Sequence, residues 1–216
     1  MITRNSAGKW GGLVGVVGMV IWWVVATVLG LMWSSYNAVT NVISALAGVG
    51  APYAGVQQLN FYIFGASIII FAIGLLAWSD RGWRLLVGVP LLVVFGTGVI
   101  VAGFFQYDPN NLEAATTQYH NTASLVTFLA AIPAISITSW GLNHDARWPN
   151  YRNKFVPLGI AILTIGGLAI FLVSTGSGPS GWMGLGQRIF LLPLTGWLAY
   201  HAFLLYRLSD RSNASA

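Results

Sequence analysis

Six long apolar stretches restrict what this sequence can fold into. They cover about residues 10–33, 59–78, 85–105, 121–140, 156–174 and 188–206. Each is close to the roughly 20 residues that an α-helix needs to cross the hydrocarbon core of a bilayer. Charged side chains make up only 7% of the chain, whereas about 25% is usual in soluble domains. We therefore predict an all-α polytopic membrane protein, in which residues 1–216 form a single bundle of six transmembrane helices.

Basic residues fall almost entirely on one side of the predicted bundle. Nine of the ten Lys and Arg residues lie before the first helix, after the last helix, or in the second and fourth connections. By the positive-inside rule this side is cytoplasmic, so we predict a multi-pass protein of the cell membrane with both termini in the cytoplasm. The basic residues are too scattered to form a groove for nucleic acid, which we exclude as a partner.

The types of residue present limit the chemistry of any metal or cofactor site. The chain has no cysteine, which excludes disulfides, iron–sulfur clusters and cysteine-ligated zinc. His120, His144 and His201 fall in different parts of the predicted bundle. They cannot converge on one zinc ion in the way seen in membrane hydrolases that resemble alkaline ceramidases. We expect no metal and no cofactor.

The predicted outer connection at residues 34–58 carries no charged side chain. Within it, Asn37, Thr40, Asn41 and Ser44 recur at the spacing of one helix face. This pattern predicts a short interfacial helix with an uncharged polar stripe. Two arrangements are open: the stripe faces water at the membrane surface, or it turns inward and lines a pocket.

A small set of polar residues lies at or beside the predicted outer helix ends. His120, Ser124 and Thr127 lie on one face of the fourth helix and form a polar line that we expect to face the bundle interior. Asp108 is a further candidate, although its Asp-Pro-Asn-Asn context is also typical of a turn. The predicted ligand-binding residues are Asn41, Ser44, Asn60, Asp108, His120, Ser124, Gln187 and Arg188, with Glu113 and Asn121 nearby.

Arg188 is the only basic residue on the predicted outer face. It lies at the start of the sixth helix, where the helix dipole is already positive, so we expect a counter-anion. Asp108, Glu113 and a lipid phosphate are the candidates for this partner. The alternative is an interfacial arginine that extends its side chain to the lipid headgroups.

Several of these residues lie in motifs that resemble those of the bacterial and archaeal family with domain of unknown function 998. The motifs are Asn41-Val-Ile-Ser44-Ala-Leu, Asn60, Gly103-Phe-Phe-Gln-Tyr-Asp108-Pro109, His120 and the Gly-Gln187-Arg188 start of the last helix. Gln106 and Tyr107 stand where the family has a proline followed by one residue. The resemblance covers most of the chain and implies six membrane helices without an established activity.

Three functions fit these observations. We expect an outward-facing polar pocket that binds a membrane lipid or another amphiphile. The first alternative is a membrane-embedded lipid hydrolase or transferase with Ser44 as nucleophile, His120 as base and Asp108 as the orienting carboxylate. The second is a structural subunit of a membrane complex. Small-residue faces, formed by Gly11, Gly15 and Gly18 in the first helix and by Gly98 with Ala102 in the third, pack either within the chain or against a homo-oligomeric or other membrane-protein partner.

Overall fold

The computed structural model describes residues 3–148, 155–176 and 181–214, and in these ranges the chain is all-α. The long helices are α1 (Arg4–Met32), α2 (Ala54–Trp78), α3 (Trp83–Phe104), α4 (Ala115–Leu142), α5 (Phe155–Thr175) and α6 (Met183–Ala214), with a short 3-10 helix η1 (Ile43–Ala47). Within the described ranges, six helices are long and apolar enough to cross a membrane. The predicted fold class is therefore confirmed, and the protein is a multi-pass membrane protein.

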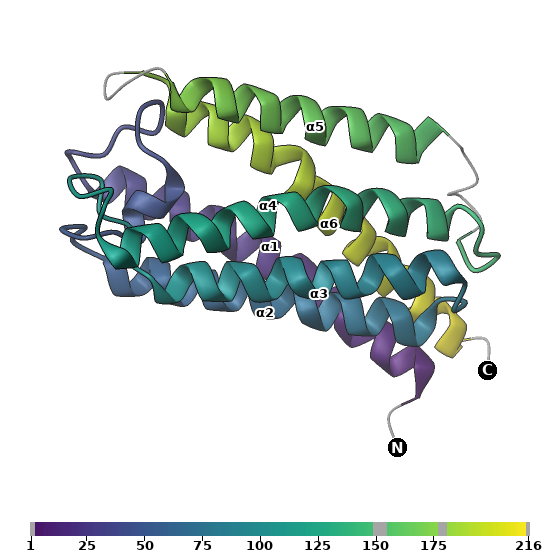
Figure 1. Cartoon of the computed structure of the whole chain (residues 1–216). Helices are drawn as coiled ribbons and strands as arrows, with labels where there is room; N and C mark the ends of the chain where they lie inside the picture. The colour runs from purple at the N-terminus through teal and green to yellow at the C-terminus, as the bar shows by residue number, and fades with distance from the viewer. Residues whose placement is uncertain (1–2, 149–154, 177–180, 215–216) are drawn as a thin grey trace.

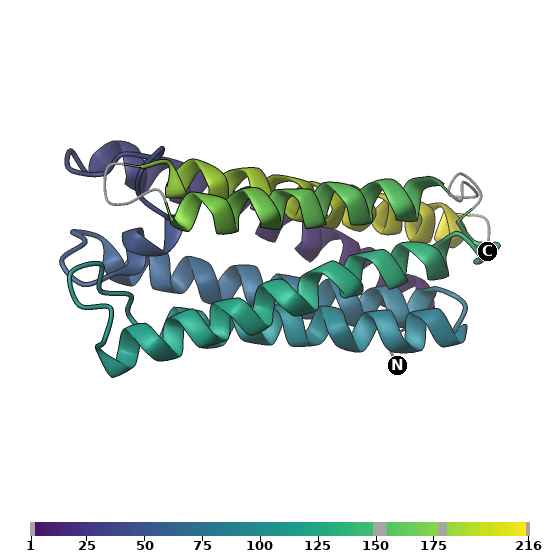
Figure 2. The same cartoon turned by 45° about the horizontal axis from the view of Figure 1, so that its top comes forward.

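The helices form a bundle in which α1 lies against α2 and α6, α3 lies between α2 and α4, and α5 packs on α6 and α4 (Figure 1). Helix α5 is the most peripheral, because 22% of its apolar 18-residue stretch is buried inside the protein, compared with 56% for the corresponding stretch of α2. Figure 2 shows that α4 and α5 diverge toward the end of the bundle that carries η1. We call this end, with residues 33–53 and 105–114, the outer end.

Glycines allow the helices to approach closely, as lipid-embedded packing requires. A Cβ atom on Gly18 would lie 2.1 Å from the Ser67 hydroxyl oxygen on α2, and one on Gly98 would lie 2.1 Å from Thr127 Oγ1 on α4. Gly11 and Gly15 likewise face α2 and α6 at close range. The sequence left open whether these glycines pack within the chain or against a partner protein. In this structure they pack within the chain.

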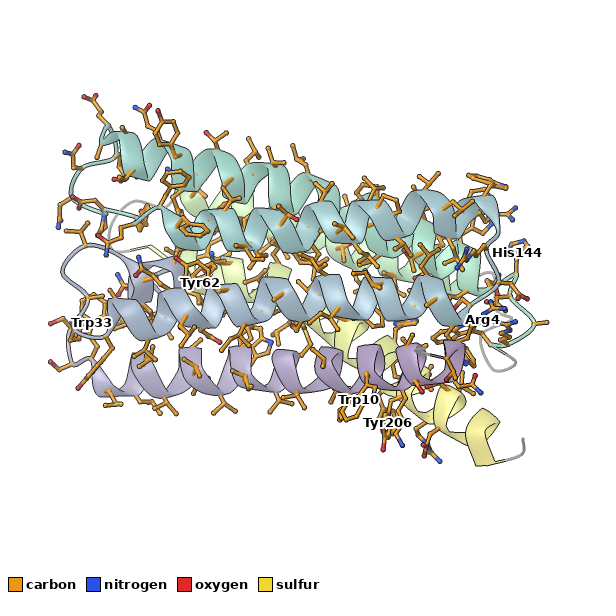
Figure 3. All side chains as sticks on the ribbon, turned by 90° about the horizontal axis from the view of Figure 1, so that it is seen from below. Arg4, Trp10, Trp33, Tyr62, His144 and Tyr206 are labelled. Carbon is orange, nitrogen blue, oxygen red and sulfur yellow. The ribbon has the colours of Figure 1, made fainter. Side chains whose placement is uncertain are left out.

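The opposite end of the bundle, which we call the basic end, holds both chain termini (Figure 1). Figure 3 shows Arg4 and His144 at this end and Trp33 at the outer end. Arg4 donates hydrogen bonds to the carbonyl oxygens of Ala77 at 3.0 Å and Ser79 at 3.1 Å. These donors satisfy carbonyls that the last turn of α2 leaves without helical partners. That the basic end faces the cytoplasm stays a prediction.

Asp145 organises the connection after α4 at the basic end. Its carboxylate accepts hydrogen bonds from the backbone N–H groups of Asp80 and Arg147, both at 2.8 Å. The Arg147 guanidinium lies 3.3 Å from the Asp80 carboxylate and also donates to the carbonyl of Trp78 at the end of α2. Burial raises the pKa of Asp145, and the two backbone hydrogen bonds oppose this shift.

Candidate functional site

The first outer connection folds into a segment, residues 36–47, that packs on the bundle; we call it the docked segment. Asn37 Oδ1 accepts a hydrogen bond from the Val39 N–H, and Asn41 Oδ1 accepts one from the Asn37 N–H, both at 2.8 Å. Asn side chains commonly compete for local backbone groups in this way. The predicted short helix is present as η1 and is preceded by a turn, so that Ser44 is buried while Asn37 is exposed.

The start of α6 holds the docked segment in place. The buried Gln187 side chain accepts a hydrogen bond from the Ile43 N–H at 2.6 Å, and the Leu185 N–H donates to the Val39 carbonyl at 2.9 Å. The two backbones approach so closely at Gly184 that a Cβ atom there would lie 2.2 Å from the Asn41 carbonyl oxygen. Glycine is therefore required at this contact.

Arg188 also holds the docked segment. Its Nη1 donates to the carbonyl oxygens of Ala38 at 2.8 Å, Asn41 at 3.1 Å and Gly184 at 2.9 Å, while Nη2 donates to the Tyr36 hydroxyl at 2.6 Å. Burial raises the pKa of Tyr36, and the adjacent guanidinium opposes the shift. In the part of the chain that the structure describes, Arg188 forms no ion pair with Asp108 or Glu113. Of the expected partners, neither carboxylate pairs with Arg188, whose hydrogen bonds to the described residues all go to neutral oxygen atoms.

A cavity of about 450 Å³ opens at the outer end between the docked segment and helices α4, α5 and α6. We call it the His120 cavity. It brings together five residues that the sequence identified: Ser44, His120, Asn121, Ser124 and Gln187. The remaining lining residues are mostly apolar: Val42, Tyr107, Leu112, Leu125, Phe128, Leu168, Phe171, Leu172, Thr175 and Met183.

His120 is held in one orientation by the end of α3. Its Nδ1 lies 2.8 Å from the Ala102 carbonyl oxygen and 3.0 Å from the Phe105 carbonyl oxygen. Because both partners are acceptors, Nδ1 carries the proton in the neutral imidazole, and Nε2 is left as a hydrogen-bond acceptor. The orienting groups are therefore backbone carbonyls that the last turn of α3 leaves without helical partners.

The polar line along α4 continues from this cavity into the bundle. Ser44, Ser124 and Gln187 also line a smaller space of about 40 Å³, which we call the inner chamber, together with Trp22 and Thr127. This volume exceeds the roughly 10–15 Å³ that one buried water requires. The expectation that the polar line faces the bundle interior is confirmed.

Asp108 lies outside the His120 cavity and forms a turn. Its Oδ1 accepts a hydrogen bond from the Asn110 N–H at 2.9 Å, and its own N–H donates to Thr117 Oγ1 at 3.0 Å. Tyr107, immediately before it, lines the cavity instead. Burial raises the pKa of Tyr107, and the negative charge of Asp108 adds to the shift. The predicted arrangement in which Asp108 orients His120 is thus not assembled in this structure.

Asn60 binds α1 rather than lining the His120 cavity. Its Nδ2 donates to the Trp22 carbonyl at 3.1 Å and to Gln57 Oε1 at 3.2 Å. Asn60 Oδ1, Gln57 Nε2 and Trp22 Nε1 are buried, and none of them has a hydrogen-bond partner in the described part of the chain. Asn60 therefore belongs to a buried polar cluster between α1 and α2.

Residues 16–204 match the family model described as "Protein of unknown function (DUF998)". The chain belongs to the DUF998 family. Neither a curated protein nor a solved structure gives a significant match. The predicted family resemblance is confirmed, and the DUF998 match spans all six long helices, from the middle of α1 to the C-terminal half of α6.

The residues of the motifs that resemble the DUF998 family lie in different parts of the structure. Ser44, His120 and Gln187 share the His120 cavity. Asn41 and Arg188 hold the docked segment, Asp108 forms a turn, and Asn60 bonds to α1.

Sequence reasoning missed the apolar wall of the His120 cavity. Leu168, Phe171, Leu172 and Thr175 of α5 line it at the spacing of one helix face. The spacing is visible in the sequence, but nearly every neighbouring residue of this helix is also apolar. A cavity-lining face and a lipid-facing face therefore have the same composition in this DUF998 protein.

Proposed function

We propose that this DUF998 protein binds an uncharged amphiphile of the membrane in the His120 cavity. One observation carries the proposal: a single space of about 450 Å³ has an uncharged polar wall and an apolar wall. Its volume falls within the roughly 300–1,000 Å³ that is typical of small-molecule pockets. A molecule with one polar end and one alkyl end matches both walls.

The polar wall favours a neutral headgroup over a charged one. Ser44 and Ser124 provide hydroxyl groups, Asn121 provides an amide, and His120 Nε2 is an acceptor. No Lys, Arg, Asp or Glu is among the described residues that line the cavity. A phosphate or carboxylate bound here would lose its hydration without gaining a counter-ion, which is costly. A hydroxyl, ester or amide group meets suitable partners.

The apolar wall suits the alkyl part of such a molecule and gives it a route from the bilayer. Phe128 of α4 and Phe171 of α5 form part of this wall. Leu125 on α4 and Leu172 on α5 also line the cavity and are 52% and 54% exposed. They mark its exposed rim on these two helices, and α4 and α5 diverge toward the outer end (Figure 2). A ligand can therefore enter laterally between α4 and α5.

The test is native mass spectrometry with lipid extraction on gently purified protein. Leu172→Trp fills the cavity rim, and Leu163→Trp is the matched control, because Leu163 lies on the same helix, is 62% exposed and is absent from the cavity lining. We expect a neutral amphiphile to copurify with the wild type and with Leu163→Trp. Its retention by Leu172→Trp should fall about tenfold or more, equivalent to about 1.4 kcal/mol. A wild-type chain without amphiphile, or equal retention in both variants, contradicts the proposal.

A second candidate function is a hydrolase or transferase acting on a neutral ester. It is favoured by the presence of Ser44 and His120 in the same cavity. In this mechanism His120 Nε2 accepts the proton of the Ser44 hydroxyl while the oxygen attacks the ester carbonyl, and the α3 carbonyls orient the imidazole in place of a carboxylate. The C–O bond of the ester then breaks, the leaving alcohol takes the proton from His120, and water or a second alcohol releases the acyl group from Ser44. Loss of turnover in Ser44→Ala with retained amphiphile would favour this function. Absence of turnover in the wild type would leave binding alone.

The third function considered from the sequence, a structural subunit, gains no support from the glycine-rich faces. Gly11, Gly15 and Gly18 contact α2 and α6 of the same chain, and Gly98 contacts α4. The glycine faces thus support packing within the chain.

A further inference from the structure

A second cavity, of about 200 Å³, lies on the other side of the docked segment from the His120 cavity. We call it the Arg188 cavity; it is lined by the outer part of α1, Tyr36 and Arg188. Consecutive residues of the docked segment separate the two spaces, because Ile43 lines the Arg188 cavity while Val42 and Ser44 line the His120 cavity. The chemistry of the two cavities can therefore differ.

Arg188 has hydrogen-bonding capacity that the protein does not use. A guanidinium carries two hydrogens on each terminal nitrogen and one on Nε. Nη1 contacts three carbonyl oxygens, and Nη2 contacts only the Tyr36 hydroxyl. In the described part of the chain this leaves the Nε hydrogen and one Nη2 hydrogen without an acceptor. Two such donors match the oxygens of a phosphate.

The charge of Arg188 is also unneutralised. The four groups that it contacts are neutral, and the only ion pairs among the described residues are Lys9–Asp210 and Arg147–Asp80. A partly buried cation at the end of a membrane helix is costly without an anionic partner. Helix α6 begins at Met183, so its dipole adds positive potential near Arg188. The site is thus electrostatically incomplete.

We propose that the Arg188 cavity binds a phosphate group, carried by a membrane phospholipid. The lipid is the favoured source because the cavity adjoins an exposed apolar face of α1: Val24, Val28 and Leu31 are 54%, 45% and 81% exposed. Acyl chains can lie along this face while the phosphate contacts Arg188. Free phosphate has the same chemistry but gains nothing from the apolar face. The Arg188 cavity is distinct from the His120 cavity, so this proposal stands without the amphiphile proposed above.

Thr27 allows a test that leaves the Arg188 hydrogen bonds intact. It lines the cavity and is exposed, and its hydroxyl takes part in no hydrogen bond with the described residues. Thr27→Glu places a carboxylate in the cavity that competes with phosphate for the guanidinium, and Thr27→Gln is the neutral variant of the same size. Each purified protein is titrated with phosphatidylglycerol in a neutral detergent, and the bound lipid is counted by native mass spectrometry.

We expect the wild type and Thr27→Gln to bind phosphatidylglycerol with equal affinity. Thr27→Glu should bind it at least about tenfold more weakly. Diacylglycerol, which lacks the phosphate, should not distinguish Gln from Glu at position 27. Equal phosphatidylglycerol binding by the two variants would overturn the proposal. Inorganic phosphate at millimolar concentration separates the two sources: failure to displace phosphatidylglycerol supports the lipid, and displacement would assign the site to free phosphate.

Discussion

Gly184→Ala provides a direct test of how the docked segment is held. The new Cβ atom would lie 2.2 Å from the carbonyl oxygen of Asn41 and 2.7 Å from that of Ala38. Both contacts are backbone atoms, which cannot rotate away as a side chain can. The docked segment must therefore move away from α6, although the substitution adds a single methyl group.

The magnitude follows from the contacts that this movement weakens. They are the neutral hydrogen bond from Leu185 to Val39 and the two bonds from Arg188 to the carbonyls of Ala38 and Asn41. A neutral hydrogen bond contributes about 1 kcal/mol and one to a charged group about 1.5–3 kcal/mol. Overpacking alone costs about 1–3 kcal/mol. Because the displaced carbonyls at the outer end can partly regain water, we expect Gly184→Ala to lower the unfolding free energy by about 2–4 kcal/mol.

The assay is reversible unfolding in mixed micelles, followed by tryptophan fluorescence. Gly196→Ala is the matched control, because Gly196 lies in the same helix and a Cβ atom there has no atom within 4 Å. Both substitutions raise helix propensity by about 1 kcal/mol. The difference between the unfolding free energies of the two variants therefore reports the cost of the contact at position 184. The native chain lacks cysteine, so a single Val39→Cys also reports how readily a thiol reagent reaches the docked segment. Equal stability of the two alanine variants within about 0.5 kcal/mol, a typical effect at a neutral surface site, would refute the reasoning.

Three further predictions address other parts of the bundle. Gly98→Ala should destabilise the protein by about 1–3 kcal/mol because of its overlap with Thr127 Oγ1, and the added Thr127→Ala should restore much of the loss in a double-mutant cycle. His120→Ala removes the donor to two carbonyls at the end of α3 and should cost about 1–3 kcal/mol in the same unfolding assay; a loss no larger than that of exposed Asn121→Ala would contradict this. Burial raises the pKa of Asp145 above its usual 3.8, so the folded chain holds this proton more tightly than the unfolded chain. Stability should therefore fall as pH rises from about 4 through the raised pKa, and unfolding measured at several pH values should show a smaller fall in Asp145→Asn.

The membrane fold was predictable because its main determinants are local in the sequence. An apolar stretch of bilayer length must form its backbone hydrogen bonds internally, which in this chain means a helix. The helix ends were less predictable. Helix α4 begins at Ala115, before the apolar stretch, because the chain continues to form helical hydrogen bonds through the polar residues up to His120. A prediction from apolar stretches ends the helix where the residues become polar, whereas the helical backbone can continue through those polar residues.

The candidate site was predictable in its residues but not in its arrangement. The sequence places His120 and Arg188 at the same end of the bundle, and a common pocket was the natural expectation. The structure puts the docked segment between them, so they line separate cavities. That separation depends on how Asn37 and Asn41 bond to the local backbone, which their spacing on a helix does not show. Asp108 was predicted both as a site residue and as a turn residue, and the structure has the turn.

Gln187 and Arg188 are neighbours in the chain, yet they line different cavities while both bonding to the docked segment. Thermodynamic linkage follows from this arrangement. A ligand that shifts the docked segment from one side changes the free energy of binding on the other side, and the reciprocal effect must have the same size. If both proposed ligands bind, the position of this short stretch of backbone would couple the occupancy of one cavity to that of the other.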